Sequence, residues 1–410
     1  MHPVRTDAVG LPVGGRRVPR PGPIPRSRVL CTPRRFVHAG PVIAAFVRRV
    51  AACLGWVWIA GAVLGWNQAR SAEPKDIRVE RLFGPEIPTG DYKHPASITE
   101  LANGDLFLAF FSGEGEYKDN AAAVFGSRLP RGSRRWSRPV AIATNPFHAL
   151  GNAVPWQAPD GVVWLFYVTR YGELWDASRI TAKISHDGAR TWSESFMLTF
   201  EAGTMVRNRP IVLGTGEYLL PVYHEVGNDP ESVGRDCTSS FLRFDPKTRK
   251  WSESNRVHSR LGNIQPAPAV IDGDRLVAFC RRGGGYEGQP DGWLVRTESN
   301  DGGRTWSAGT DSEFPNPNAA VDLLRLANGH HLLVYNNSFS DRTPLTVAIS
   351  TDGARTFPHR RDLLADPKGD YGYPTAIQTR DGLVHVAFTS DERKVVRQAV
   401  FAESAILRQR

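Results

Sequence analysis

The chain has 410 residues, of which 41% are hydrophobic and 23% charged, and this composition indicates a soluble globular protein. Its 39 Gly and 30 Pro residues favour a turn-rich β-protein and disfavour a helix bundle. The net charge of +9 comes from residues 1–72, which hold 11 Arg, no Lys and one acidic residue. The whole chain has 51 basic and 42 acidic residues, so the rest of it has 40 basic and 41 acidic residues. Because the rest is nearly neutral, a nucleic-acid partner is not expected.

Residues 1–49 are basic, rich in Arg and Pro and without hydrophobic periodicity, and we expect a disordered leader there. An apolar run of 17 residues follows at 50–66 (VAACLGWVWIAGAVLGW), and soon after it the small-residue sequence ARSAE. A basic segment, an apolar run and a cleavage region within residues 50–72 are typical of a signal peptide. Because the run reaches the lower limit of a membrane span, an N-terminal anchor through residues 50–66 is the alternative. Both predict export to the periplasm, the cell surface or the extracellular space.

A repeat of about 56 residues fills the rest of the chain. Each unit has an apolar strand, a tight turn ending in Gly, two further strands and, in five units, a closing Trp or Phe. The turn glycines are 57, 55, 57, 56 and 53 residues apart: Gly104, Gly161, Gly216, Gly273, Gly329 and Gly382. Asn-Gly and Asp-Gly between apolar runs predict β-hairpins with type I′ turns. The strands after these turns, such as LFLAFF and VVWLFY, are apolar throughout, as expected for strands covered on both faces.

Three units contain the motif Ser-x-Asp-Gly-x-Arg-Thr-Trp/Phe, at 185–192, 299–306 and 350–357. The Asp and Ser side chains cap backbone N–H groups of a turn and the aromatic residue packs between strands, so we expect Asp187, Asp301 and Asp352 to be structural. Residues 77–87 (IRVERLFGPEI) remain to complete the last unit. The sequence therefore predicts an all-β, six-bladed β-propeller with four-stranded antiparallel blades over residues 77–408.

These motifs are Asp-boxes, and together with the segment Tyr92-Lys93-His94-Pro95 they resemble the sialidase (neuraminidase) superfamily, in particular its BNR-repeat, sialidase-like branch. The resemblance covers nearly all of residues 77–408 and implies a propeller of the sialidase type. It also implies a site at the channel mouth with three arginines for the carboxylate of an acidic sugar, a Tyr nucleophile with a Glu partner, and an Asp acid. It implies no cofactor, and the Cys and His spacings predict no metal site.

Several residues match this family site. Arg342, in RTPLTV before an Asp-box strand, matches the third arginine, and Arg281 matches the second. Tyr373, in DYGYPTAI, matches the nucleophile, with Tyr371 beside it. The family's Glu-Pro pair reads Gln265-Pro266 here, and an amide cannot take a proton from the tyrosine.

The first arginine of the family is replaced by Lys93, which keeps the charge but lacks the planar guanidinium that binds a carboxylate through two hydrogen bonds. His94 beside it is a candidate general acid or base. For the acid, expected in the loop after the second strand of this blade, the candidates are Glu114, Glu116 and Asp119. Polar residues beside other inner strands are candidates for sugar binding or for satisfying the channel backbone: Arg207, Asn208, Asp322, Asn336 and Asn152.

Three functions follow from this site. The first is an exported exo-glycosidase of the exo-α-sialidase type that removes a terminal acidic sugar from a glycan. The second is an enzyme of the same fold with other chemistry, such as a polysaccharide lyase or a glycosidase on uronate-containing glycans, in which His94 and a Tyr transfer protons. The third is a glycan-binding propeller without catalysis.

Cys237 and Cys280, in the body of the chain, form either one disulfide or two buried thiols.

Overall fold

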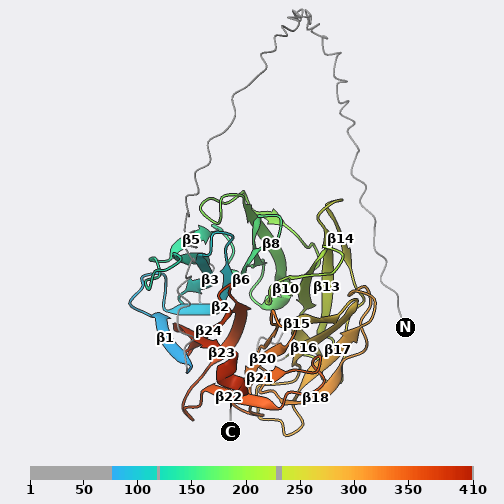
Figure 1. The fold of residues 1–410 in the computed structure, drawn as a ribbon. Helices are drawn as coiled ribbons and strands as arrows, with labels where there is room; N and C mark the ends of the chain where they lie inside the picture. The colour runs from blue at the N-terminus through green and yellow to red at the C-terminus, as the bar shows by residue number, and fades with distance from the viewer. Residues whose placement is uncertain (1–75, 118–120, 228–232, 409–410) are drawn as a thin grey trace, which may run out of the picture. The chain divides into compact units, whose positions relative to one another are not determined.

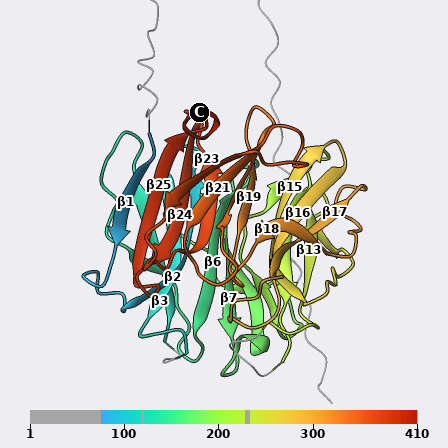
Figure 2. The ribbon, with the colours of Figure 1, turned by 90° about the horizontal axis from the view of Figure 1, so that it is seen from below.

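The computed structural model describes residues 76–117, 121–227 and 233–408, which form six antiparallel sheets around a central axis (Figure 1). Each sheet is one blade, and neighbouring blades contact one another around the axis. Seen after a rotation of 90°, the strands run side by side along the height of the propeller (Figure 2). The predicted all-β, six-bladed propeller is confirmed. Residues 1–49 and 50–72, with the expected leader and signal peptide or anchor, lie outside the described residues.

The first three blades follow one another along the chain, with strands ordered from the axis outward. Blade I contains β2 (Tyr92–Glu100), β3 (Leu106–Gly113), β4 (Ala123–Leu129) and β5 (Val140–Ala143), and blade II contains β6 (Leu150–Gln157), β7 (Val163–Arg170), β8 (Ser178–Ser185) and β9 (Phe196–Met197). In blade III the inner strand is split into β10 (Thr204–Val206) and β11 (Ile211–Val212), both paired with β12 (Tyr218–His224), and β13 (Thr238–Asp245) and β14 (Lys250–Glu253) complete the sheet. Pro210, which has no N–H to donate to a ladder, lies in the split.

The other three blades complete the ring. Blade IV contains β15 (Asn263–Asp272), β16 (Arg275–Arg282), β17 (Trp293–Ser299) and β18 (Thr310–Pro315), and blade V contains β19 (Asp322–Arg325), β20 (His331–Asn336), β21 (Leu345–Ser350) and β22 (His359–Leu364). Blade VI contains β23 (Gly372–Gln378), β24 (Leu383–Ser390), β25 (Val395–Ala402) and, outermost, β1 (Arg78–Phe83). A 3₁₀ turn, η1 (Trp175–Ala177), and a short helix, α1 (Ser404–Leu407), are also present.

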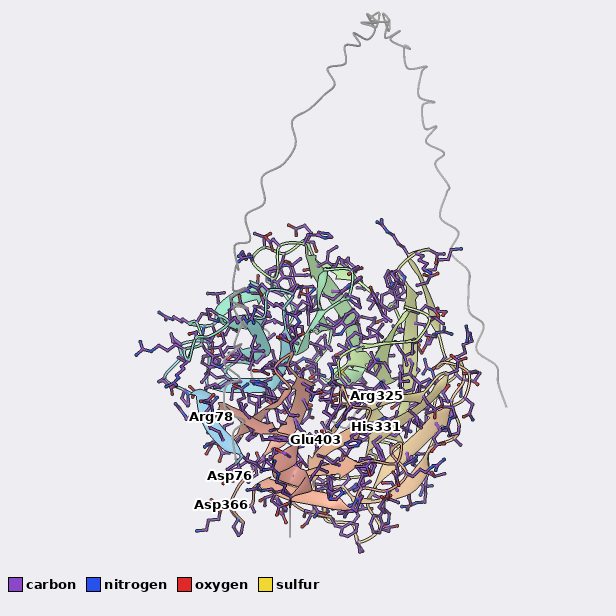
Figure 3. All side chains as sticks on the ribbon, in the orientation of Figure 1. Asp76, Arg78, Arg325, His331, Asp366 and Glu403 are labelled. Atoms are coloured by element: carbon purple, nitrogen blue, oxygen red, sulfur yellow. The ribbon has the colours of Figure 1, made fainter. Side chains whose placement is uncertain are left out.

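The ring is closed by the beginning of the described chain, as the sequence predicted. β1 pairs antiparallel with β25, with Arg78 opposite Val400. Asp76, just before β1, accepts a hydrogen bond from Arg361 of β22 at 2.5 Å, and Glu403, just after β25, pairs with His330 at 2.6 Å. Asp76 and Glu403 are labelled in Figure 3. Both ends of blade VI are therefore also tied to blade V.

The six hairpins form where the glycines predicted them, but the turn type differs from the prediction. A type I′ turn needs positive φ at two residues, whereas in all six of these turns only the glycine has it, as at Gly104 with φ 85°. The N–H of Gly104 donates to the carbonyl of Leu101, and Leu101 donates to the carbonyl of Asp105. This is a type I turn followed by a left-handed glycine, which also suits the right-handed twist of the paired strands.

The Asp-boxes are structural, as predicted. In the first, Asp187 Oδ1 accepts hydrogen bonds from the backbone N–H of Arg190 and Thr191 at 3.0 and 2.9 Å, and Ser185 Oγ accepts from Ala189 N–H at 2.9 Å. The box at Asp301 repeats this pattern, and its closing Trp306 stacks on Phe241 of the preceding blade with ring centroids 3.9 Å apart. These turns join third to fourth strands, at the end of the propeller opposite to the loops that follow the second strands.

The two cysteines of the body, Cys237 and Cys280, are both buried and both have free thiols. Of the two alternatives the sequence left open, buried thiols are therefore present. None of the helices in the described part of the chain has the length and apolar character that a membrane crossing requires.

Candidate functional site

A β-bulge interrupts the inner strand of four blades near one end of the channel. Pairing with the second strand shifts register around His94, Asn152, Gln265 and Tyr373. At three of these residues φ is positive: 44° at Asn152, 57° at Gln265 and 56° at Tyr373. For residues with a side chain this conformation costs roughly 1–3 kcal/mol and is concentrated at functional sites, where bulges re-aim side chains. The four bulged residues all line one pocket.

The pocket lies at the mouth of the channel, between the bulges and the loops that follow the second strands. Its cavity volume is about 30 Å³. The lining residues come from blades I, II, III, IV and VI: His94, Phe111, Glu116, Tyr117, Asn152, Trp175, Tyr223, Glu225, Ile264, Gln265, Arg281, Tyr286 and Tyr373.

Tyr373 is surrounded by guanidinium groups. Its hydroxyl accepts a hydrogen bond from Arg281 Nη1 at 2.8 Å, and the guanidinium carbon of Arg342 lies 5.4 Å from the centre of its ring. Burial by itself would raise the pKa of Tyr373, but the charges of Arg281, Arg342 and Arg393 outweigh burial and lower it below its usual value. The arginines therefore favour the phenolate, which is the nucleophilic form of the side chain.

Arg342 has an unsatisfied donor. Its Nη2 is buried and has no hydrogen-bond partner in the described part of the chain. The side chain lines a second cavity of about 280 Å³, which it shares with Tyr286 and Arg393. Because a buried donor without a partner costs about 1–3 kcal/mol, a ligand that supplies an acceptor here gains that free energy.

A third guanidinium comes from blade VI and not from Lys93. The Lys93 side chain is buried and donates to the carbonyl of Gly90, away from the pocket. Arg393, in the turn between β24 and β25, takes the corner next to Tyr92 and donates to its hydroxyl at 3.3 Å. The backbone N–H of Lys93 donates to the carbonyl of Arg393 at 2.8 Å and so fixes that turn. Arg281, Arg342 and Arg393 thus form an arginine cradle around Tyr373.

Of the three predicted acid candidates, Glu116 lies in the pocket. Its carboxylate accepts hydrogen bonds from Tyr92 Oη at 3.1 Å and from Trp175 Nε1 at 3.1 Å, and it forms an ion pair with Arg393. These contacts fix the carboxylate of Glu116, which in turn positions the guanidinium of Arg393. Glu114 is exposed and does not line the pocket, and Asp119 lies outside the described residues.

Glu225 is a second carboxyl group of the pocket, at the end of β12. Burial raises its pKa to about 7; Arg281 opposes this effect, and the negative charges of Glu116 and Asp176 add to it. Glu225 can therefore hold a proton near neutral pH and is a candidate proton donor.

His94 lies against Tyr373, with ring centroids 4.1 Å apart. Its Nδ1 is hydrogen-bonded to Thr389 Oγ1 at 2.8 Å, while Nε2 is buried without a partner among the described residues. Burial, together with the charges of Arg393 and Arg342, lowers the pKa of His94 well below its usual value. The imidazole is therefore neutral at pH 7, with one ring nitrogen unused.

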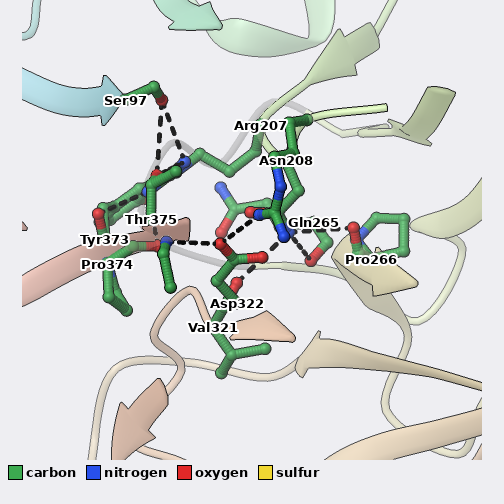
Figure 4. Close-up of polar contacts among 12 residues, drawn as sticks. Ser97, Arg207, Asn208, Gln265, Pro266, Val321, Asp322, Tyr373, Pro374 and Thr375 are labelled. Atoms are coloured by element: carbon green, nitrogen blue, oxygen red, sulfur yellow. Dashed lines mark hydrogen bonds and ion pairs between the residues drawn. The ribbon is translucent and has the colours of Figure 1, made fainter. Parts of the chain in front are cut away.

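The floor of the pocket is a buried polar network (Figure 4). Arg207, which is 1% exposed, donates to the carbonyls of Tyr373 and Pro374, the latter at 3.2 Å, and to Thr375 Oγ1 at 3.0 Å. Asn208 does the same for the neighbouring bulge, donating to the carbonyl of Pro266 at 2.9 Å. Both side chains hold the bulges in place from beneath the pocket.

Asp322 ties three blades together in the same network. Its Oδ2 accepts from Arg209 Nη1 of blade III and from the backbone N–H of Ala376 in blade VI, both at 2.7 Å (Figure 4). Tyr371 packs in the hydrophobic core against Phe388, and Asn336 donates to the carbonyl of Tyr371 at 3.0 Å. Asp322, Tyr371 and Asn336 therefore do not line the pocket, and their predicted contact with substrate stays a prediction.

The structure brings the sequence-predicted Tyr373, His94, Glu116, Gln265 and Arg281 together in one pocket, with Arg342 against the tyrosine ring. Sequence reasoning missed Arg393, which lies in the charged turn Asp-Glu-Arg-Lys, a pattern typical of solvent-exposed hairpin tips. It also missed Glu225, because nothing in the sequence distinguishes this residue from a carboxylate in solvent. Among the described residues, no group of His, Cys, Asp and Glu is placed to hold a metal ion.

Residues 104–386 match the family model described as a BNR repeat-like domain. The chain belongs to this family. None of the curated proteins matches this chain in sequence. Among solved structures, similar folds include the Hadza microbial sialidase Hz136, with a TM-score of 0.65, 14% identity and coverage of 78% of this chain and 67% of that one. The intramolecular trans-sialidase of Ruminococcus gnavus has a TM-score of 0.65, 11% identity and coverage of 80% and 98%. A protein of unknown function from Dyadobacter fermentans has a TM-score of 0.64, 18% identity and coverage of 80% and 99%. At these identities the likeness concerns the fold, which this BNR repeat-like domain shares with sialidases.

Proposed function

We propose that the protein is an exported glycoside hydrolase of the sialidase type that removes a terminal acidic sugar from a glycan, with sialic acid as the default substrate. The observation that carries this proposal is the arginine cradle: Arg281, Arg342 and Arg393 surround Tyr373, and a buried donor of Arg342 has no partner among the described residues. Of the three guanidinium groups, Arg393 pairs with Glu116, whereas Arg342 forms no ion pair with a described carboxylate, so the cradle fits a carboxylate-bearing sugar. Sialidases among the proteins of similar fold support the same substrate class.

The chemistry would proceed in two steps. The Tyr373 oxygen attacks the anomeric carbon while the bond to the leaving oxygen breaks and Glu225 gives its proton to that oxygen. Water then attacks the anomeric carbon, gives its proton back to Glu225, and releases the sugar and the Tyr373 phenolate. Because Gln265 cannot act as the base, the arginine cradle takes over the activation of Tyr373 by lowering its pKa.

A fluorogenic aryl sialoside tests this proposal. The wild-type protein should release the fluorophore, and Tyr373→Phe should lose at least about 100-fold in kcat/KM, since it removes the nucleophile and leaves the ring in place. Because Tyr371 packs in the core and not in the pocket, Tyr371→Phe is the matched control and should keep its activity. No release by the wild-type protein at high concentration, or equal activity of Tyr373→Phe, contradicts the proposal.

A lyase acting on uronate glycans is the second candidate, and His94 favours it. A neutral imidazole with an unused Nε2, next to Tyr373, can take the α-proton of a uronate whose carboxylate is neutralised by arginine. Tyr373 would then protonate the leaving oxygen, and a double bond would form in the sugar. Such a product absorbs in the ultraviolet, so a rise in absorbance on uronate polysaccharides that disappears in His94→Ala would select the lyase. Fluorophore release that is insensitive to His94→Ala would select the hydrolase.

A further inference from the structure

Tyr286 stands between the two cavities of the site. It lines the pocket at Tyr373, which measures about 30 Å³, and also the cavity of about 280 Å³ at Arg342 and Arg393. Ligand sites usually measure roughly 300–1,000 Å³, so the first cavity alone is too small for a sugar ring, while the two joined reach the lower end of that range. A sugar at Tyr373 therefore requires Tyr286 to move.

The hydroxyl of Tyr286 holds the place of an anion. It accepts a hydrogen bond from Arg281 Nη2 at 2.9 Å, and the guanidinium carbons of Arg281 and Arg342 lie 5.5 and 5.8 Å from its ring centre. The Nε of Arg281 donates to Asn318, and its Nη1 donates to the Tyr373 hydroxyl and, at 3.5 Å, to Gln265. A carboxylate that takes over the hydrogen bond from Nη2 therefore replaces the phenol oxygen.

The loop that carries Tyr286 has a fixed base and an open tip. Below it, Arg282 donates to the carbonyls of Gly283 and Gly285 at 2.8 and 3.2 Å, and the N–H of Gly284 donates to Val233 at 2.7 Å. A Cβ built on Gly285 would meet nothing within 4 Å, and the neighbouring Tyr286 is itself partly exposed. An outward rotation of Tyr286 would leave the hydrogen bonds of the loop base intact.

The exchange favours one class of ligand. A carboxylate attracts the arginine charge and can accept two parallel N–H···O bonds from one guanidinium, which a neutral hydroxyl cannot do. A carboxylate that replaces the phenol also offers an acceptor to the unsatisfied Nη2 of Arg342. A sugar hydroxyl gains nothing over the Tyr286 hydroxyl, because both are neutral acceptors.

We propose that Tyr286 is a specificity-determining partition: its hydroxyl occupies the anion position on Arg281, and a carboxylate-bearing sugar displaces it and joins the two cavities, whereas a neutral sugar does not. This inference rests on the proposed function in so far as the arginine cradle binds an anion. It adds the residue that makes the site select for that anion.

The test measures the affinity of the full-length protein for N-acetylneuraminic acid, D-galacturonic acid and neutral D-galactose by isothermal titration calorimetry. Tyr286→Phe frees the Arg281 N–H and should bind at least one of the acidic sugars roughly 3- to 10-fold more tightly than the wild type, with no gain for galactose. Tyr286→Ala should bind that acidic sugar more tightly than the wild type and should also gain affinity for galactose, because the partition is gone. Tyr171→Phe is the matched control, since it removes a phenol hydroxyl from an exposed tyrosine.

The outcomes separate the two proposals. If the wild type binds an acidic sugar and Tyr286→Phe binds it equally or more weakly, Tyr286 is not a competitor and the partition is refuted, while the arginine cradle stands. If neither the wild type nor either Tyr286 variant binds any acidic sugar, both proposals are refuted. Urea unfolding of each variant checks that its fold is unchanged.

Discussion

Replacing Arg342 by alanine tests the arginine cradle most directly, because the guanidinium makes no hydrogen bond to another described residue and its Nη2 is buried without a partner. The substitution therefore removes an unsatisfied donor, worth about 1–3 kcal/mol, and two ring contacts, with Tyr373 and Tyr286, worth roughly 0.5–1 kcal/mol each. These effects oppose each other, so the free energy of unfolding should change by no more than about 2 kcal/mol.

Binding should change far more than stability. A charge-assisted pair between Arg342 and a carboxylate is worth about 3 kcal/mol at the upper end of the range for hydrogen bonds to charged groups, which corresponds to a loss of affinity of roughly 100-fold. Calorimetric titration with an acidic sugar measures this loss, and urea unfolding measures stability. Arg134→Ala, at an exposed arginine in the turn between β4 and β5, removes the same charge and should bind like the wild type. Unchanged binding by Arg342→Ala would refute the cradle.

Three further substitutions test the rest of the site. Folding raises the pKa of Glu225 from 4.5 to about 7, so the folded wild-type protein loses stability as the pH increases across that interval. The melting temperature of Glu225→Gln should therefore exceed that of the wild type by at least about 2 °C at pH 8 and equal it at pH 4. The decrease of kcat/KM above pH 7 should be absent in this variant. The same melting temperatures at pH 8 would contradict this. Arg207→Met should lower the free energy of unfolding, measured by urea denaturation, by about 3 kcal/mol, because the carbonyls of Tyr373 and Pro374 lose their hydrogen-bond donor. A smaller loss of stability than in the exposed control Arg134→Met would contradict this role of Arg207. Asp301→Ala should cost about 1–2 kcal/mol of stability through the lost turn caps but leave activity at 25 °C unchanged, and a fall in kcat for the folded variant would show that the Asp-box is more than structural.

The fold was predictable because it is a local pattern repeated six times. Each turn glycine with its flanking apolar strands specifies one hairpin, and Asp301 caps a turn made by its immediate neighbours in the chain. Hydrogen bonds between residues three or four positions apart in the chain depend little on the rest of the molecule. Each repeat therefore forms its own hairpin and capped turn, and the number of repeats gave the number of blades. The turn type was the exception, because Asn-Gly and Asp-Gly are compatible with more than one hairpin geometry.

The site was only partly predictable, because its properties arise between blades. Tyr373, Arg281 and Arg342 were found by their family motifs, but Lys93 was expected at the corner that Arg393 takes, some 300 residues further along the chain. The pKa of Glu225 is set by burial and by Arg281 and Glu116 on other blades, and the role of Tyr286 depends on two arginines from two blades. By itself the sequence determined the six-bladed ring and which end of each strand faces the mouth. Only the tertiary structure decided which charges meet there, because closing a ring brings together side chains whose separation along the chain carries no information about their distance in space.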